Sequence, residues 1–148
     1  MKDKFDIQVS DYCNLKCKHC LMDSSLNKCK VNFKNITKTL EKQNNIKTIY
    51  LSGGEPLVSE ENAKNIFELM NKFPYTEFKM VTNLCYDLTP YRLLVLSNVN
   101  SLQTSFDIGI RFGNIKNLVK WYNNCKYLIS KGICLEVICT ITKLVINK

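Results

Sequence analysis

The feature that most constrains the fold of this chain is the regular alternation of two hydrophobic periodicities. Strand-like segments occur at about residues 5–10, 46–52, 77–82, 101–107 and 133–142, and helical patterns fill the intervals between them. Parallel strands need crossover connections of about a dozen residues or more, and the intervals are long enough to provide them. The repeated order of strand and helix therefore predicts an α/β fold with a parallel sheet.

Three of the helices have recognisable ends. Ser59 is placed to cap the second helix, Thr89–Pro90 begins the third, and Gly132 suits the left-handed position that follows the fourth. The residues expected to face the core share the helical period. They are Ala63, Ile66, Phe67 and Met70 in the second helix, and Ile115, Leu118, Trp121, Tyr122, Cys125 and Leu128 in the fourth, at about 114–131.

The strands alternate polar and apolar residues, although strands that are covered on both faces are apolar throughout. In segment 101–107 the residues that share the polar face are Ser101, Gln103, Ser105 and Asp107. Segments 5–10, 77–83 and 133–142 show the same division. We therefore predict a curved sheet with helices on its outer face and a polar hollow inside, which is a partial TIM-like (βα) barrel of parallel strands.

Eight cysteines are unusual in a chain of 148 residues. A disulfide-rich scaffold is usually secreted and follows an export signal, but the charged start of this chain has no apolar signal segment, and no stretch approaches the ~18 apolar residues of a membrane span. We therefore expect one cytoplasmic domain, with reduced thiols available for metal binding or catalysis.

The formal net charge of +8 is spread among acidic and asparagine residues and is not gathered on one stripe. The lysines at 28, 30, 34, 38 and 42 recur at near-helical spacing, which is typical of a solvated helix face. Nucleic-acid binding is therefore weakly supported, and it stays only as an alternative.

Three cysteines follow the first strand in a Cx3Cx2C array, namely Cys13, Cys17 and Cys20. A short loop can wrap three thiolates around one corner of an iron–sulfur cube, and the fourth iron then has no protein ligand and can bind a substrate. The alternatives are a zinc site with His19 as the fourth ligand, or a redox disulfide.

A second motif, Leu51-Ser52-Gly53-Gly54-Glu55-Pro56, ends the second strand. Two glycines let the backbone approach a ligand closely, and Glu55 brings a carboxylate to the same place. Taken alone, the segment is also a common connector from a strand to a helix.

Together the two motifs resemble the radical S-adenosylmethionine (radical SAM) superfamily, in which a Cx3CxφC loop follows the first strand and a Gly-Gly-Glu-Pro motif ends the second. The resemblance implies a [4Fe–4S] cluster on Cys13, Cys17 and Cys20, with S-adenosylmethionine (SAM) on the free iron. Reductive cleavage of SAM then gives a 5′-deoxyadenosyl radical that abstracts a substrate hydrogen. The amino-acid sequence of the cysteine loop is similar to that of peptide-modifying maturases, and this resemblance implies a peptide substrate.

The resemblance also implies cofactor contacts for the residues around the two motifs. Gly53, Gly54 and Glu55 are expected to receive the methionyl amino group of SAM, and His19 takes the position that packs near the adenine. The protein positions the cofactors and excludes quenchers of the radical. No catalytic side chain is assigned.

Three further polar residues follow the third and fourth strands. Asn83, Ser105 and Asp107 lie at the carboxyl ends of strands, where barrel enzymes build their active sites, and the resemblance implies that they bind the ribose or the methionyl carboxylate. Leu84 departs from the family pattern, because the third-strand motif of relatives often reads Thr-Asn-Gly.

The family core is a six-stranded partial barrel, whereas this chain ends soon after its fifth strand. We therefore expect residues 1–148 to form a single, incomplete radical SAM core domain. An open fifth strand exposes unpaired backbone groups and is expected to pair with a partner or a second copy. The alternative function is a truncated or split, catalytically deficient module that binds cluster and SAM and needs a partner. The enzyme needs an electron donor such as flavodoxin or ferredoxin, and no membrane partner is expected.

Overall fold

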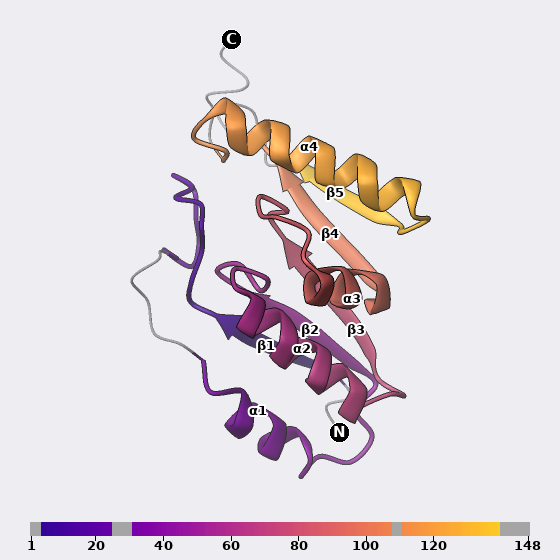
Figure 1. The fold of residues 1–148 in the computed structure, drawn as a ribbon. Helices are drawn as coiled ribbons and strands as arrows, with labels where there is room; N and C mark the ends of the chain where they lie inside the picture. Colours follow the sequence, from indigo (N-terminus) through magenta and orange to yellow (C-terminus); the bar gives the residue numbers. More distant parts are fainter. Residues whose placement is uncertain (1–3, 25–30, 108–110, 140–148) are drawn as a thin grey trace.

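The computed structural model describes residues 4–24, 31–107 and 111–139, in which strands and helices alternate (Figure 1). The elements are β1 (Lys4–Ser10), α1 (Phe33–Leu40), β2 (Thr48–Gly53), α2 (Glu60–Lys72), β3 (Glu77–Thr82), α3 (Pro90–Asn98), β4 (Ser101–Phe106), α4 (Ile115–Ser130) and β5 (Leu135–Cys139). The predicted order is confirmed. The last strand begins two residues later than expected, and residues 140–142 of its predicted range lie outside the described residues. No described helix is both long and apolar enough to cross a membrane.

The strands form one sheet in the order β1-β2-β3-β4-β5, and every neighbouring pair is parallel. Right-handed crossovers that advance in one direction place their helices on the same face of a sheet. Figure 1 shows the helices along one side of the sheet accordingly. The α/β fold with a parallel sheet is therefore confirmed, and the carboxyl ends of the strands meet along one edge.

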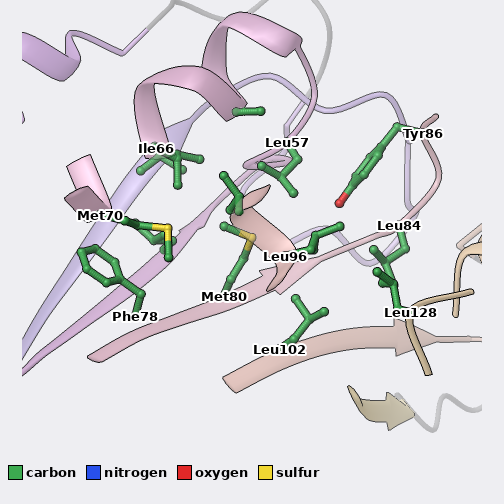
Figure 2. Close-up of a cluster of buried hydrophobic side chains, with 14 of the residues drawn as sticks. Leu57, Ile66, Met70, Phe78, Met80, Leu84, Tyr86, Leu96, Leu102 and Leu128 are labelled. Atoms are coloured by element: carbon green, nitrogen blue, oxygen red, sulfur yellow. The ribbon is translucent and has the colours of Figure 1, made fainter. Parts of the chain in front are cut away.

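The core lies between the helices and the covered face of the sheet (Figure 2). Burial of each large side chain contributes about 1.5–3 kcal/mol, so this layer supplies most of the stability that holds the strand ends in place. The largest side chains with at most 2% exposure on these elements are Ile49, Leu51, Met80 and Leu102 from strands and Ile66, Leu69, Leu96 and Leu128 from helices.

The opposite face of the sheet is more open, as predicted. Gln8 is exposed, Lys79 and Gln103 are half-buried, and Val81 is 43% exposed. Asp107 differs from the prediction because it is only 1% exposed, although Ser105 beside it is half-buried. The reason is that Asp107 follows the end of β4 and turns toward residues of two loops.

The predicted helix ends are confirmed. Ser59 Oγ accepts the backbone N–H of Asn62 at 3.1 Å, and Pro90 occupies the first turn of α3 behind Thr89. After α4, Gly132 has φ +78°, its N–H donates to the Ile129 carbonyl, and a second bond joins Ile133 N to Leu128 O. This pair of bonds is the Schellman arrangement that closes a helix on a glycine.

The buried stripes of two helices differ in part from the prediction. In α2, Leu69 is fully buried and Phe67 only partly, because Phe67 packs beside Tyr91 of α3 at the edge of the core. In α4, Ile115 is 69% exposed and Tyr122 is 54% exposed. A helix that covers a single layer buries a narrow stripe, and in α4 that stripe is Trp121, Cys125 and Leu128.

β5 is open on both of its faces. Leu135 is half-buried under the described helices, whereas Val137 and Ile138 are 52% and 43% exposed. Cys139 is exposed as well. Cys125 of α4 is buried, as its place on the core-facing stripe predicts.

Candidate functional site

The three cysteines of the loop after β1 line one cavity of about 350 Å³ at the carboxyl ends of the strands. This volume lies within the range of small-molecule sites. Of the other residues expected at the site, His19, Gly53, Gly54, Asn83 and Ser105 also line the cavity, whereas Glu55 and Asp107 do not. The remaining lining residues are Leu15, Leu21, Ser52, Val81, Thr82 and Arg111.

The two glycines tie the turn after β2 to the start of the cysteine loop. Gly54 N donates to Ser10 O and Glu55 N donates to Tyr12 O, each at 2.6 Å. A Cβ on Gly53 would lie 2.2 Å from Ser10 O, and one on Gly54 would lie 2.2 Å from Tyr12 O. The glycines therefore allow a close approach of the turn to the backbone of Ser10 and Tyr12, which brings together the segments that carry the two motifs.

The Glu55 carboxylate points into the protein and is 0% exposed. Its Oε1 accepts from Leu57 N at 3.0 Å and Thr82 Oγ1 at 2.7 Å, and its Oε2 accepts from Asn83 N at 2.6 Å. Burial raises the pKa of Glu55 to about 7, and these three hydrogen bonds oppose the rise. The side chain therefore joins the ends of β2 and β3 beneath the cavity.

Asn83 connects the turn after β3 to the cysteine loop. Its Nδ2 lies 3.6 Å from Cys13 Sγ and 2.8 Å from Asn14 Oδ1, and its Oδ1 accepts Cys85 N at 2.8 Å. Asn14 Nδ2 donates a hydrogen bond to Cys85 O at 2.7 Å. The amide thus has its polar atoms engaged with both loops, and it supports the sulfur of the first cysteine.

Leu84 adopts the backbone conformation that glycine adopts without strain. Its φ is +52°, which costs a residue with a Cβ roughly 1–2 kcal/mol. The side chain is 0% exposed, so its burial offsets that cost. Asn124 of α4 donates to the Leu84 and Tyr86 carbonyls at 2.9 and 2.7 Å and holds the turn in place.

His19, Asp107 and Arg111 form a charged cluster beside the cysteines. Asp107 Oδ2 lies 2.5 Å from Arg111 Nε and 3.3 Å from His19 Nε2, and Arg111 Nη2 is 3.3 Å from His19 Nε2. The Asp107 side chain is 0% exposed, so it lies behind the other two and orients them. His19 Nδ1 is buried without a hydrogen-bond partner among the described residues.

Arg111 is the site residue that sequence reasoning missed. It lines the cavity, and its carbonyl oxygen lies 3.7 Å from Cys17 Sγ. Two signals point to it in retrospect. Only two arginines occur among the 21 basic residues, and Arg111 stands four positions after Asp107, although no strand or helix pattern links the two.

The donor set of the cavity fits an iron–sulfur cluster. Burial raises the pKa of Cys13 to about 11 and also raises that of Cys17, which Arg111 opposes, so binding of a metal centre must displace thiol protons. The seven described cysteines are all free. Within the same described residues, no three His, Cys, Asp or Glu side chains converge as ligands of one ion. Three thiols that line one cavity suit a cluster, in which the thiolates ligate different iron atoms.

Comparison with known families agrees with this donor set. A family model described as a 4Fe-4S single cluster domain matches residues 7–117, which is more than half of the 148 residues. The chain belongs to this family. The match includes the cysteine loop, the glycine turn and the strands that carry them, and it stops within α4. The search of curated proteins gave no match.

Solved structures show the same fold. Streptococcus suis SuiB bound to S-adenosylmethionine is similar with a TM-score of 0.70 and 17% identity, over 95% of this chain and 34% of that chain. The structure of anSMEcpe with bound AdoMet has a TM-score of 0.68 and 18% identity over 97% and 44% of the two chains. BtrN in complex with AdoMet and 2-DOIA has a TM-score of 0.66 and 17% identity over 94% and 57%.

These neighbours share the fold of this chain, and the predicted partial (βα) barrel of parallel strands is therefore confirmed. The chain spans about one third to somewhat over half of the length of the structures that it matches.

Proposed function

We propose that this chain is the cluster- and SAM-binding core of a radical SAM enzyme, with Cys13, Cys17 and Cys20 as the ligands of a [4Fe–4S] cluster. One observation carries the proposal. The three thiols line the same cavity as the Gly53–Gly54 turn, at the carboxyl ends of parallel strands. Membership of the 4Fe-4S single cluster domain family and the AdoMet-bound structural neighbours support it.

In this proposal, each wall of the cavity binds a different part of SAM. Gly53 and Gly54 present backbone to the methionyl amino group, and Asn83 and Ser105 present polar side chains to the carboxylate or the ribose. His19 packs beside the adenine, held by Asp107 and Arg111. When bound and reduced, the cluster supplies the electron that cleaves the SAM sulfonium to methionine and a 5′-deoxyadenosyl radical, which abstracts a substrate hydrogen.

Two residues act in this proposal through their neighbours. Glu55 positions Asn83 and Thr82, because its buried carboxylate accepts from both. Asp107 positions Arg111 and His19, because it lies behind them with its side chain fully buried. Both residues are therefore proposed as positioning residues of the SAM site.

The proposed substrate class is a peptide. SuiB is similar to this chain also in its complex with the precursor peptide SuiA, with a TM-score of 0.70 and 16% identity. The open face of the sheet, which carries Gln8, Lys79 and Gln103, is the proposed contact surface for such a peptide. The exposed edge of β5 is the proposed contact for a partner or a second copy.

The experiment that tests the function is anaerobic reconstitution with iron and sulfide, followed by low-temperature EPR of the dithionite-reduced protein. A [4Fe–4S]⁺ signal that changes when SAM is added is the expected result. A Cys17→Ala variant is expected to lose the cluster, and a Cys125→Ala variant, whose thiol is buried under α4, is the matched control that keeps it. Zinc in the purified protein and no cluster after reconstitution would refute the proposal.

Product analysis separates the enzyme from a deficient module. If the cluster forms and SAM perturbs it, 5′-deoxyadenosine is expected under reducing conditions. A cluster that binds SAM without forming 5′-deoxyadenosine would identify a binding module instead of an enzyme.

A further inference from the structure

Arg111 is the one permanently charged side chain among the described residues that line the cysteine cavity. The lining includes no aspartate or glutamate, because Glu55 and Asp107 lie outside it. Its other ionisable groups are the three thiols and the imidazole of His19. Within the described part of the chain, the walls of the cavity therefore carry one fixed positive charge and no fixed negative charge.

The guanidinium of Arg111 is held in place at the cavity wall. Its Nε donates to Asp107 Oδ2 at 2.5 Å, and its Nη2 lies 3.3 Å from His19 Nε2. The Arg111 side chain is 17% exposed, so little water surrounds it. Arginine keeps its charge at physiological pH, and a partly buried charge is screened by salt less than an exposed one. Arg111 therefore supplies a lasting positive charge at a defined place.

Both the main chain and the side chain of Arg111 meet the cysteine loop. The Arg111 carbonyl oxygen lies 3.7 Å from Cys17 Sγ, and the guanidinium contacts His19, which stands between Cys17 and Cys20 in the chain. The positive charge also opposes the rise that burial causes in the pKa of Cys17, so it favours a negatively charged sulfur there.

Asp107 does not cancel the charge of Arg111 at the cavity. The Asp107 side chain is 0% exposed and lies outside the lining, whereas Arg111 belongs to the lining. The cation therefore faces the cavity, and the carboxylate lies behind it. Because the Coulomb energy falls with distance, Arg111 attracts a negative group in the cavity more strongly than Asp107 repels it.

We propose that Arg111 stabilises the reduced form of the cluster by its charge, an inference that rests on the proposed function. Three thiolates give a [4Fe–4S]²⁺ cluster a net negative charge, and one electron from an external reductant such as dithionite makes it [4Fe–4S]⁺ and more negative. No bond changes, and no proton moves. A nearby cation stabilises the more negative state more than the other, so Arg111 raises the reduction potential.

The test is an EPR-monitored redox titration of the reconstituted protein without SAM. In Arg111→Gln, the ratio of reduced to oxidised cluster at a fixed potential should fall at least tenfold, which corresponds to a midpoint potential about 59 mV more negative for one electron. The matched control is Lys16→Gln/Lys18→Gln, which removes two exposed positive charges on either side of Cys17. Its ratio should change less than twofold at high salt, where the effect of Arg111→Gln should persist.

Two further variants separate charge from a structural disturbance. Arg111→Lys keeps the charge and should restore most of the ratio that Arg111→Gln loses. Asp107→Asn removes the carboxylate behind Arg111 and should raise the ratio above that of the unaltered protein. Disturbed packing alone does not predict these opposite directions. If Arg111→Gln assembles no cluster, the Asp107→Asn titration decides, and a ratio that does not rise would contradict the proposal.

Failure of this inference differs from failure of the proposed function. If the unaltered protein forms no cluster, the proposed function is wrong. If the cluster forms but the ratio is the same in Arg111→Gln and the unaltered protein, the charge of Arg111 does not act on it. Weaker SAM binding by Arg111→Gln together with that unchanged ratio would identify Arg111 as a SAM contact instead. An equal fall in the lysine control at high salt would also overturn the proposal.

Discussion

Asn83 Nδ2 lies 3.6 Å from Cys13 Sγ, although the two residues stand 70 positions apart in the chain. The contact joins the turn after β3 to the first of the three proposed cluster ligands. Asn83 is itself held, because its N–H donates to Glu55 Oε2 and its Oδ1 accepts Cys85 N. Groups that orient a metal ligand in this way tune the metal centre as well as the ligand geometry.

Removal of the Asn83 amide should lower the reduction potential of the cluster. A donor N–H near a ligand sulfur stabilises the more negative, reduced state, so Asn83→Leu should shift the midpoint potential to more negative values. Asn83→Asp, which keeps the shape and removes the donor, should shift it in the same direction. The measurement is an EPR-monitored redox titration, with the surface variant Asn98→Leu as the control. An unchanged potential in both Asn83 variants would show that the amide has no influence on the cluster.

Gly54→Ala should destabilise the protein by about 3 kcal/mol, at the upper end of the cost of overpacking. The new Cβ would lie 2.2 Å from the Tyr12 carbonyl oxygen, so the cysteine loop and the glycine turn must separate. Gly132→Ala is the matched control, because open space surrounds its Cβ position and only the positive φ opposes the change. Its expected cost is about 1 kcal/mol. Urea unfolding of both variants checks this, and equal costs would contradict the packing argument.

The stability that depends on Glu55 should fall as the pH rises. The pKa of Glu55 is about 7 in the folded protein against an ordinary value of 4.5, so the folded state binds the proton more tightly than the unfolded state. The contribution of protonated Glu55 to the free energy of unfolding is therefore complete below about pH 4.5 and is lost as the pH rises through about 7. This contribution is about 3 kcal/mol, because each unit of pKa shift corresponds to 1.36 kcal/mol.

Urea unfolding between pH 4.5 and pH 8 tests this titration. Glu55→Gln does not titrate, and its free energy of unfolding should depend less on pH than that of the unaltered protein. The variant should also be less stable by about 1–3 kcal/mol at low pH, because the amide nitrogen that takes the place of Oε2 cannot accept the Asn83 N–H. Parallel pH curves for the two proteins would mean that Glu55 does not titrate in this range.

Arg92→Lys should destabilise the fold by about 2–4 kcal/mol, although it conserves the charge. The guanidinium donates to the Leu57, Val58 and Asp87 carbonyls, each at 2.9 Å, and lies 4.8 Å from the centre of the Tyr86 ring. A lysine cannot reach three carbonyls in this plane and leaves some of them unpaired in the interior. Thermal unfolding compares the stability of Arg92→Lys with that of the surface variant Lys64→Arg. A loss of stability in Arg92→Lys no larger than in Lys64→Arg would contradict the structural role of Arg92.

Local sequence signals predicted the order of elements well. Caps such as Ser59 and Gly132 act on their own helix, and hydrophobic periodicity records which face of an element is buried, so both can be found without knowledge of distant residues. The pattern was less accurate at Ile115 and Tyr122, where the width of the buried stripe depends on how much of the sheet lies under the helix.

The sequence by itself determined the fold class, the family and the two motifs of the candidate site, because these depend on spacing along the chain. Only the tertiary structure decided which side chains meet in the cavity. It places Arg111 among the cysteines, turns the Glu55 carboxylate into the interior, and buries Asp107 behind His19. The physical reason is that a side chain at a strand end takes its direction from hydrogen-bond partners on neighbouring strands, and these partners are distant in the sequence.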